Sequence, residues 1–299
     1  MPTLRQLRRR RVSVENIQQV TQAMKMVAAA KLRRAQADIL SARPYARRLD
    51  ALLGHLVSRI RGAERASAGQ TEDVSDSHPL LVQREPERIG LVAVTSDRGL
   101  CGSFNSNLIR SATARLARGG SAEVHLICVG KKGWDFFRRR EYPILGEQID
   151  FFNELAFPHA RRIVEMVLQH YTEMPLDRVD IIYNEFQSVI QQNVMVEQFL
   201  PILPDEPEGD PFFIDYLYEP SREKILDAML PKHLEVQMWR ILLESHAAEH
   251  AARMTAMDAA TDNARELIEQ LTLDINRARQ TAITKEITEI VGGAEALKG

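Results

Sequence analysis

One stretch of this sequence, from Lys232 to Val291, contains neither glycine nor proline. As a single α-helix rising 1.5 Å per residue, it would be about 90 Å long, which is more than one globular domain needs. A second such stretch, from Thr3 to Arg43, would make a helix of about 60 Å. The sequence therefore predicts two long helices, one near each end of the chain.

Both stretches carry apolar or small residues at intervals of three and four, which is the spacing of a coiled-coil seam. The N-terminal seam comprises Ile17, Val20, Met24 and Val27. The C-terminal seam comprises Met238, Ile241, Ser245, Ala248, Ala252, Thr255 and Ala259, continued by Ala264, Ile268, Leu271, Ile275, Ala278 and Ala282. We expect the two helices to pair antiparallel, with the longer C-terminal helix overhanging. Pairing of each helix with another protein is the alternative.

Proline and glycine predict where these helices bend or end. The Arg43-Pro44 step should kink or restart the first helix, because the proline ring displaces the preceding residue from helical geometry. The helical pattern then continues to about Arg61. Gly292 and Gly293 should stop the second helix.

Between the two helices the hydrophobic period changes. Apolar runs predict strands at residues 89–95, 124–129, 179–186, 194–200 and 212–218, and helical patterns lie near residues 105–117, 132–139 and 158–173. Strands that alternate with helices imply right-handed crossovers and a mostly parallel sheet. The expected fold class is an α/β domain inserted between two long, antiparallel coiled-coil helices. The expected domains are residues 1–61 (N-terminal coiled-coil helix), 62–87 (loop), 88–220 (α/β domain) and 221–299 (C-terminal coiled-coil helix).

Composition excludes several classes of protein. Hydrophobic residues make up 44% of the chain and charged residues 27%, which argues against disorder. No apolar run approaches the ~18 residues needed to cross a bilayer. The two cysteines, Cys101 and Cys128, are too few for a disulfide framework. With a net charge of −2, the chain as a whole is not a general binder of polyanions.

Positive charge is concentrated at the N-terminus, where the first fifty residues hold twelve lysines and arginines against three acidic residues. A solvated helix face is the simplest interpretation. A positive helix also suits an acidic protein surface. Nucleic acid is not an expected partner, because no aromatic side chains are interleaved to stack on bases.

Two short motifs suggest chemistry without establishing it. The glycine-rich turn at residues 95–102 matches neither the dinucleotide nor the P-loop pattern, so we expect a structural turn. His246, Glu249 and His250 match a zinc-peptidase pattern on a helix, yet they flank the small-residue seam and nothing suggests a third ligand. Cys101 is a candidate reactive thiol near a helix N-terminus. No nucleophile and base are spaced for catalysis, so we expect no catalytic residue, cofactor or metal.

Separated blocks of the sequence resemble one family. They are IQQVTQAMKMVAA at residues 17–29, SDRGLCG at 96–102, AARM at 251–254, AATDNA at 259–264, ARQTAIT at 278–284 and EIV at 289–291. In content and order these blocks are similar to the γ subunit of the F-type ATP synthase, the central rotor shaft. The resemblance spans almost the whole chain.

The resemblance implies an architecture and a set of partners. In this family the terminal helices form a coiled coil inside a ring of three α and three β subunits. The α/β domain is Rossmann-like without a nucleotide site and lies near the membrane ring of c subunits. The implied function is that of a non-catalytic rotor that transmits torque between ion flow and ATP synthesis or hydrolysis, with the α, β, ε and c subunits as partners.

The match begins within the first turns of the chain, so the basic start is expected to belong to the shaft and not to a transit peptide. This favours a bacterial protein, peripheral to the inner membrane on its cytoplasmic side. The pattern of a plastid dithiol switch is missing, so thiol regulation is not expected.

The resemblance also implies site residues. Met24 and Lys25 lie where the shaft meets an acidic lever loop of β. Further contacts with the ring, ending in an apolar tip, comprise Arg253, Arg279, Gln280, Thr284, Ile287 and Ile290. Tyr216 and Glu219 match the region that faces the c-ring. Plain coiled-coil packing is the alternative for each residue, and a scaffold unrelated to ATP or an α/β enzyme with helical arms is the alternative function.

Overall fold

The computed structural model describes residues 3–66, 78–117, 122–174, 176–203, 219 and 221–296. Contacts within the chain divide it into two compact units. The first unit consists of residues 1–29 and 253–299, and the second of residues 30–252. No helix in the described ranges is both long and apolar enough to span a bilayer.

The two predicted long helices are α1, Leu4–Ala66, and α6, Arg222–Ala296. α1 continues through Pro44, so the expected restart of the helix at that residue is wrong. Proline removes one backbone hydrogen bond from a helix. Ala46 and Leu49, on the following turn, are buried, and their packing favours continued helix beyond the proline.

The C-terminal end of α6 also differs from the prediction. Gly292 and Gly293 lie inside the helix, so the expected stop at these glycines is wrong. A glycine costs about 1 kcal/mol relative to alanine in a helix interior, which weakens a helix without ending it. Apart from the local backbone of the helix itself, no described atom lies within 4 Å of the position that a Cβ would occupy at either glycine, so no packing contact in the described chain forces a turn there.

The predicted α/β domain contains a five-stranded sheet in the order β3-β2-β1-β4-β5. β5 is antiparallel to β4, and the other neighbours are parallel, which confirms the mostly parallel sheet. The strands are β1 (Arg88–Val94), β2 (Glu123–Val129), β3 (Ile144–Gln148), β4 (Arg178–Phe186) and β5 (Gln192–Leu200). The helices of this domain are α3 (Phe104–Ala117), α4 (Lys131–Arg138) and α5 (Phe157–Glu173), with a 3-10 turn at Phe152–Glu154.

The sequence did not predict β3, which is short and none of whose residues is fully buried. The strand expected at residues 212–218 lies outside the described residues.

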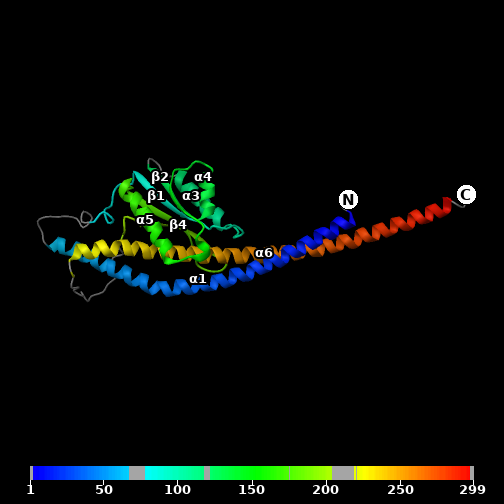
Figure 1. Cartoon of the computed structure of the whole chain (residues 1–299), viewed down its shortest axis with the longest axis horizontal. Coiled ribbons are helices and arrows are strands. Elements are labelled where there is room, and N and C mark those ends of the chain that lie inside the picture. The colour runs from blue at the N-terminus through cyan, green and yellow to red at the C-terminus, as the bar shows by residue number, and fades with distance from the viewer. Residues whose placement is uncertain are drawn as a thin grey trace. The chain divides into compact units, whose positions relative to one another are not determined.

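The sheet of the second unit is covered on both faces (Figure 1). On one face Leu108 of α3 and Phe137 of α4 pack against β1 and β2. On the other face Ile163 of α5, Leu53 of α1 and Met238 of α6 share a core with β1, β2 and β4. Residues from both long helices therefore belong to the core of the α/β domain.

In the first unit, the start of α1 and the later part of α6 are paired. The hydroxyl oxygens of Thr21 and Thr261 are 2.8 Å apart, and Lys25 Nζ donates to Asp258 Oδ1 at 2.5 Å. As the residue number increases along α1, the number of the contacting residue on α6 decreases. This confirms the antiparallel pairing.

The predicted seam of α6 is correct over part of its length. Ala264, Leu271 and Ile275 are buried in the core of the first unit. Thr255 and Ala259, by contrast, are exposed.

The predicted seam of α1 lies on the wrong face. Ile17, Val20 and Val27 are 52%, 57% and 57% exposed. The buried positions instead repeat every seven residues, at Leu7, Val14, Thr21 and Ala28. Leucine and valine fill the first two of these positions, and the small side chains of Thr21 and Ala28 let the two helices approach closely at the other two.

α6 overhangs α1, as expected. α1 begins at Leu4, and both Leu4 and Ala278 pack against the core of the first unit. All α6 residues from 279 to 293 are exposed. The last turns of α6 therefore have no helix of the described chain to cover them.

Candidate functional site

An apolar stripe on α1 is the first candidate contact surface. We call Ile17, Val20, Met24 and Val27 the α1 stripe. Met24 is half-buried, while the other three members are exposed. Apolar side chains that follow a helical period yet face solvent mark a surface suited to another protein.

Lys25 borders this stripe and is held in place. Its Nζ donates to Asp258 Oδ1 at 2.5 Å, and the two side chains are 34% and 49% exposed. The pair leaves both charges partly in water. A second carboxylate from outside could therefore reach the same ammonium group.

The overhanging end of α6 is the second candidate surface. Arg279, Gln280 and Thr284 are exposed, as the resemblance requires for contact residues. Thr284 donates its hydroxyl to the backbone oxygen of Gln280 at 2.9 Å. Ile287 and Ile290 are 56% and 70% exposed.

The remaining expected site residues differ in accessibility. Arg253 is only 9% exposed, so nearly all of its surface is covered within the chain. Glu219 is exposed. Tyr216 lies outside the described residues.

The carboxyl edge of the parallel strands is closed by the protein's own groups. Open α/β sheets bind ligands at this edge. Here the carboxylate of Asp97 accepts the backbone N–H groups of Lys131, Asp150 and Phe152 at 2.9–3.0 Å. The carboxylate thus takes the donors that would otherwise be available to an anionic ligand, which supports a structural role for the turn at residues 95–102.

The tight crossover at Gly130 adds to this closure. Its φ is +91°, and a Cβ there would lie 2.1 Å from the backbone oxygen of Thr95. Thr95 Oγ1 also accepts the N–H of Gly133 at 2.8 Å. Only glycine fits at residue 130, because the two loops pack backbone against backbone.

The suggested metal and thiol sites gain little support. The Nε2 atoms of His246 and His250 are 3.0 Å apart, but within the described ranges no three His, Cys, Asp or Glu side chains are grouped to hold a metal. Cys101 is buried, and its Sγ accepts a hydrogen bond from Asn105 Nδ2 at 3.2 Å. Burial raises the pKa of the Cys128 thiol to about 12, so this thiol stays protonated.

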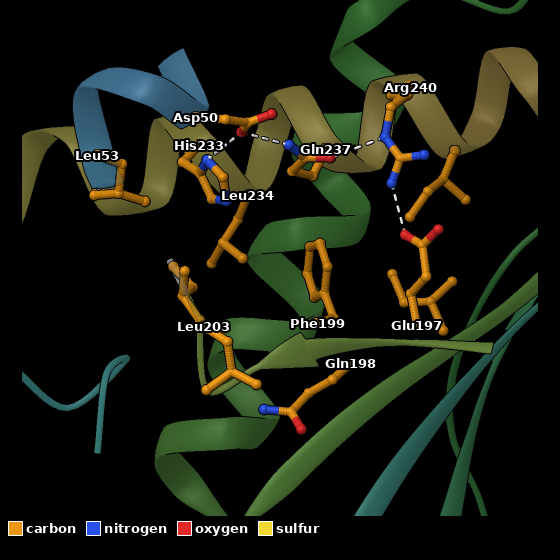
Figure 2. Close-up of a pocket in the computed structure, with 13 residues that line it drawn as sticks. Asp50, Leu53, Glu197, Gln198, Phe199, Leu203, His233, Leu234, Gln237 and Arg240 are labelled. Carbon is orange, nitrogen blue, oxygen red and sulfur yellow. Dashed lines mark hydrogen bonds and ion pairs between the residues drawn. The ribbon is translucent and has the colours of Figure 1, made fainter. Parts of the chain in front are cut away.

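A polar cluster that was not anticipated lies between α6, β4 and β5 (Figure 2). Arg240 Nη2 donates to Glu197 Oε2 at 2.6 Å, and Tyr183 donates its hydroxyl to Glu197 Oε1 at 2.5 Å. Burial raises the pKa of Tyr183, so its hydroxyl remains a donor. The only signal in the sequence was an acidic residue inside an apolar strand and an arginine on an apolar helix.

A cavity of about 390 Å³ adjoins this cluster. Its walls come from α1, α6, β4 and β5. Apolar side chains such as Leu53, Phe199 and Leu234 line it together with Asp50 and Gln237.

Comparison with known proteins identifies the family. A family model described as ATP synthase matches residues 3–297. The chain is 47% identical to the ATP synthase gamma chain of Pelotomaculum thermopropionicum, with all of both chains aligned. The chain belongs to the ATP synthase gamma chain family. The gamma chain of Chloroherpeton thalassium is 48% identical, covering 100% of this chain and 99% of that one.

Solved structures agree with the gamma-chain fold. A chain from the central stalk and c-ring structure of the Tetrahymena thermophila mitochondrial ATP synthase matches with a TM-score of 0.61 and 26% identity, covering 81% of this chain and 99% of that one. A chain of the Euglena gracilis mitochondrial ATP synthase matches with a TM-score of 0.66 and 21% identity, covering 98% and 94%. This gamma chain is a central-stalk rotor subunit of the membrane-associated ATP synthase complex and is not catalytic by itself.

Proposed function

We propose that this gamma chain turns inside a ring of three α and three β subunits and transmits torque between that ring and the membrane ring of c subunits. The exposed overhang of α6 carries the proposal. Its residues from 279 to 293 are all exposed, although they include Ile287 and Ile290. An enclosing ring would cover these groups, and apolar contacts without fixed hydrogen bonds allow one surface to rotate against another.

The α1 stripe is proposed to meet the β subunits. Met24 supplies a flexible apolar contact, and Lys25 supplies a positive charge for an acidic lever loop of β. Lys25 is already paired with Asp258, so the incoming acidic group would share the ammonium with that aspartate. Shared pairing at a partly exposed site is weak, which suits a contact that must be made and broken in each turn.

Four further residues of α6 are proposed to contribute to contact with the ring of α and β subunits. Arg279, Gln280 and Thr284 are exposed and free to reach ring residues. Arg253 is buried, so it would support the ring contact from within the shaft.

Glu219 and Tyr216 are proposed to face the c-ring, with the ε subunit as a further partner. Glu219 is exposed. The proposed location is the cytoplasmic side of a bacterial inner membrane.

The mechanism rests on the asymmetry of a single shaft among three chemically identical sites. A shaft contact must bias each site between open and closed states. Shifting such an equilibrium from 1:99 to 99:1 takes about 5.5 kcal/mol of differential interaction. One charge crossing 100 mV supplies about 2.3 kcal/mol. Several ion crossings must therefore be accumulated in the shaft for each ATP.

Co-expression with the α and β subunits of the same organism tests the proposal. We expect one gamma chain to co-elute with three α and three β subunits, and ATP hydrolysis to require it. Assembly of an active ring without the gamma chain, or ATP turnover by the gamma chain alone, would overturn the proposal.

A matched pair of variants tests the overhang. Ile290→Asp places a charge on the proposed bearing, and we expect it to lower ATP hydrolysis by the assembled ring several-fold. Leu273→Asp makes the same kind of change at a residue that is 58% exposed within the paired region, and we expect little effect. Equal effects of the two changes would argue against a bearing at the overhang.

A further inference from the structure

We propose that Arg240, Glu197 and Tyr183 form a clamp that passes mechanical load between α6 and the sheet of the α/β domain. The inference rests on the proposed function, because a clamp carries load only in a chain that transmits torque. It assigns a positioning role to three residues of the second unit. None of them belongs to the expected contacts with the ring or the membrane.

The clamp is a closed triangle of hydrogen bonds among three elements. Arg240 on α6 donates from Nη2 to Glu197 Oε2 on β5 at 2.6 Å and from Nη1 to the Tyr183 hydroxyl on β4 at 3.3 Å. The Tyr183 hydroxyl donates to Glu197 Oε1 at 2.5 Å. Each residue contacts the other two, so none can shift without straining two bonds.

The triangle is anchored at both sides. The side chain of Tyr183 is fully buried in the sheet core. Arg240 Nε donates to Gln237 Oε1 at 2.9 Å, and Gln237 Nε2 donates to Asp50 Oδ1 on α1 at 2.7 Å. A continuous chain of hydrogen bonds thus joins α1, α6 and the sheet, and Figure 2 shows Asp50, Gln237, Arg240 and Glu197 in this sequence.

The adjoining cavity makes these bonds mechanically important. Where two elements interlock through close-packed side chains, packing resists sliding. Here a cavity of about 390 Å³ is lined by residues of both α6 and β5, beside the core that Met238 and Leu200 share. Solvent in such a space cannot resist shear between the two elements. Across the cavity itself, load therefore passes through the side chains that bridge it, and these add to the packing that α6 and the sheet share elsewhere in the core.

The chemistry of arginine suits this task. Its planar guanidinium donates in fixed directions and so resists rotation, whereas a lysine ammonium is a point charge on a flexible stem. The side chains of Arg240 and Glu197 are 27% and 35% exposed, so the ion pair is only partly screened by water. Glu244 adds a second carboxylate oxygen at 3.6 Å from Arg240 Nη1.

The first test compares variants in the complete ATP synthase reconstituted in vesicles. Arg240→Gln removes both the positive charge and the planar guanidinium group. We expect ATP hydrolysis to remain within about twofold of the unaltered enzyme, while ions pumped per ATP hydrolysed fall at least threefold under load. Arg240→Lys should give an intermediate loss. Arg265→Gln is the matched control, because the pairing of Arg265 with Asp262 stays within the same helix.

A second test measures stiffness directly. Cysteine in place of Ile190, which is 89% exposed on the β4–β5 hairpin, gives an attachment point for a bead on the α/β domain. The native thiols at Cys101 and Cys128 are buried. With the ring immobilised and nucleotide absent, we expect the angular variance of the bead to at least double in Arg240→Gln. Tyr183→Phe should produce a smaller increase.

Exchanging the two charges distinguishes loss of the clamp from a general folding defect. The double variant Arg240→Glu with Glu197→Arg restores opposite charges across the same gap, and we expect it to recover at least half of the lost coupling. Coupling and bead variance unchanged in Arg240→Gln, or no recovery in the exchange, would overturn the clamp. If the unaltered enzyme itself fails to pump, the proposed function fails instead, and the two failures are thereby distinguished.

Discussion

The ammonium of Lys25 lies 2.5 Å from the carboxylate of Asp258, across the antiparallel pair formed by α1 and α6. One turn before Lys25, the hydroxyls of Thr21 and Thr261 meet at 2.8 Å. These two polar contacts fix the register of the pair, because a shift by one residue would separate both. The register in turn holds Met24 beside the pair, at the edge of the exposed α1 stripe.

Cysteines at Thr21 and Thr261 should form a disulfide within one chain. The two hydroxyls already touch, and a disulfide needs Cβ atoms about 3.5–4.5 Å apart. Mass spectrometry of the oxidised, proteolysed protein would identify the linked peptides. The control pair Thr21→Cys with Thr272→Cys places the second thiol eleven residues further along α6, about 16 Å away, and should not link. Disulfides found only between chains would contradict the internal pairing.

Replacing Met24 with lysine should impair coupling more than stability. Lysine and methionine have similar helix propensities, but the new charge stands next to Lys25 on the proposed contact surface. We expect ATP synthesis to fall several-fold while the thermal midpoint changes little. Met26→Lys is the control, because Met26 is 60% exposed and points to a different face of the helix. Normal ATP synthesis in Met24→Lys would remove Met24 from the proposed site.

Leu271 and Leu273 should respond very differently to truncation. Leu271 is 4% exposed in the core of the first unit, whereas Leu273 is 58% exposed. Leu271→Ala should cost about 2–5 kcal/mol in the free energy of unfolding, and Leu273→Ala less than about 0.5 kcal/mol. Urea unfolding of the purified chain, followed by circular dichroism, measures both. Similar costs would mean that the helix pair does not bury Leu271 in solution.

Asp97→Asn should loosen the carboxyl edge of the sheet. The two oxygens of Asp97 accept three backbone N–H groups, and an asparagine offers only one oxygen. The unmet N–H should cost about 1–3 kcal/mol. Thermal unfolding would register the loss, with Asp135→Asn on α4 as a comparison. A stability equal to that of the unaltered chain would show that these donors find water instead.

The stability should depend on pH through His78. Burial lowers the pKa of His78 from its ordinary value of 6.5, an effect that Asp227 partly opposes. Leu80 donates its N–H to His78 Nδ1 at 3.2 Å, and this bond requires the neutral ring. The folded state therefore binds this proton less readily than the unfolded state, so the free energy of unfolding falls as pH drops from 6.5 through the lowered pKa.

His78→Gln should flatten this dependence on the acid side, because glutamine does not titrate. Thermal midpoints recorded between about pH 7 and pH 5 compare the two proteins. Asp227→Asn should act in the opposite direction, since it removes the charge that raises the pKa. Parallel pH profiles for all three proteins would contradict the assignment.

Much of the fold followed from local pattern. The absence of glycine and proline over long stretches predicted α1 and α6, and apolar runs predicted four of the strands. The sequence did not predict β3, because its five partly exposed residues show too weak an alternation of apolar and polar side chains. The predictions that a helix restarts at Pro44 and stops at Gly292 and Gly293 were wrong. Proline or glycine lowers the stability of a helix by a limited amount, which the neighbouring turns can offset.

The candidate site residues also fall into two groups, those indicated by the sequence and those that only the structure brings together. Residues such as Met24 and Ile290 were reached through the resemblance, and the structure adds their accessibility. Arg240 and Glu197 had no such motif. They come from segments far apart in the sequence, and only the packing of α6 against β5 brings them to 2.6 Å.

The sequence by itself determined the two long helices, the mostly parallel sheet between them and the family to which the chain is related. The tertiary structure decided which face of each helix is buried. A helical period marks a stripe of apolar residues but not the surface that covers it. The pairing of α1 with α6 buried Thr21 and Ala28 and left Val20 and Val27 exposed, because burial depends on the fit of two surfaces and not on the hydrophobicity of one.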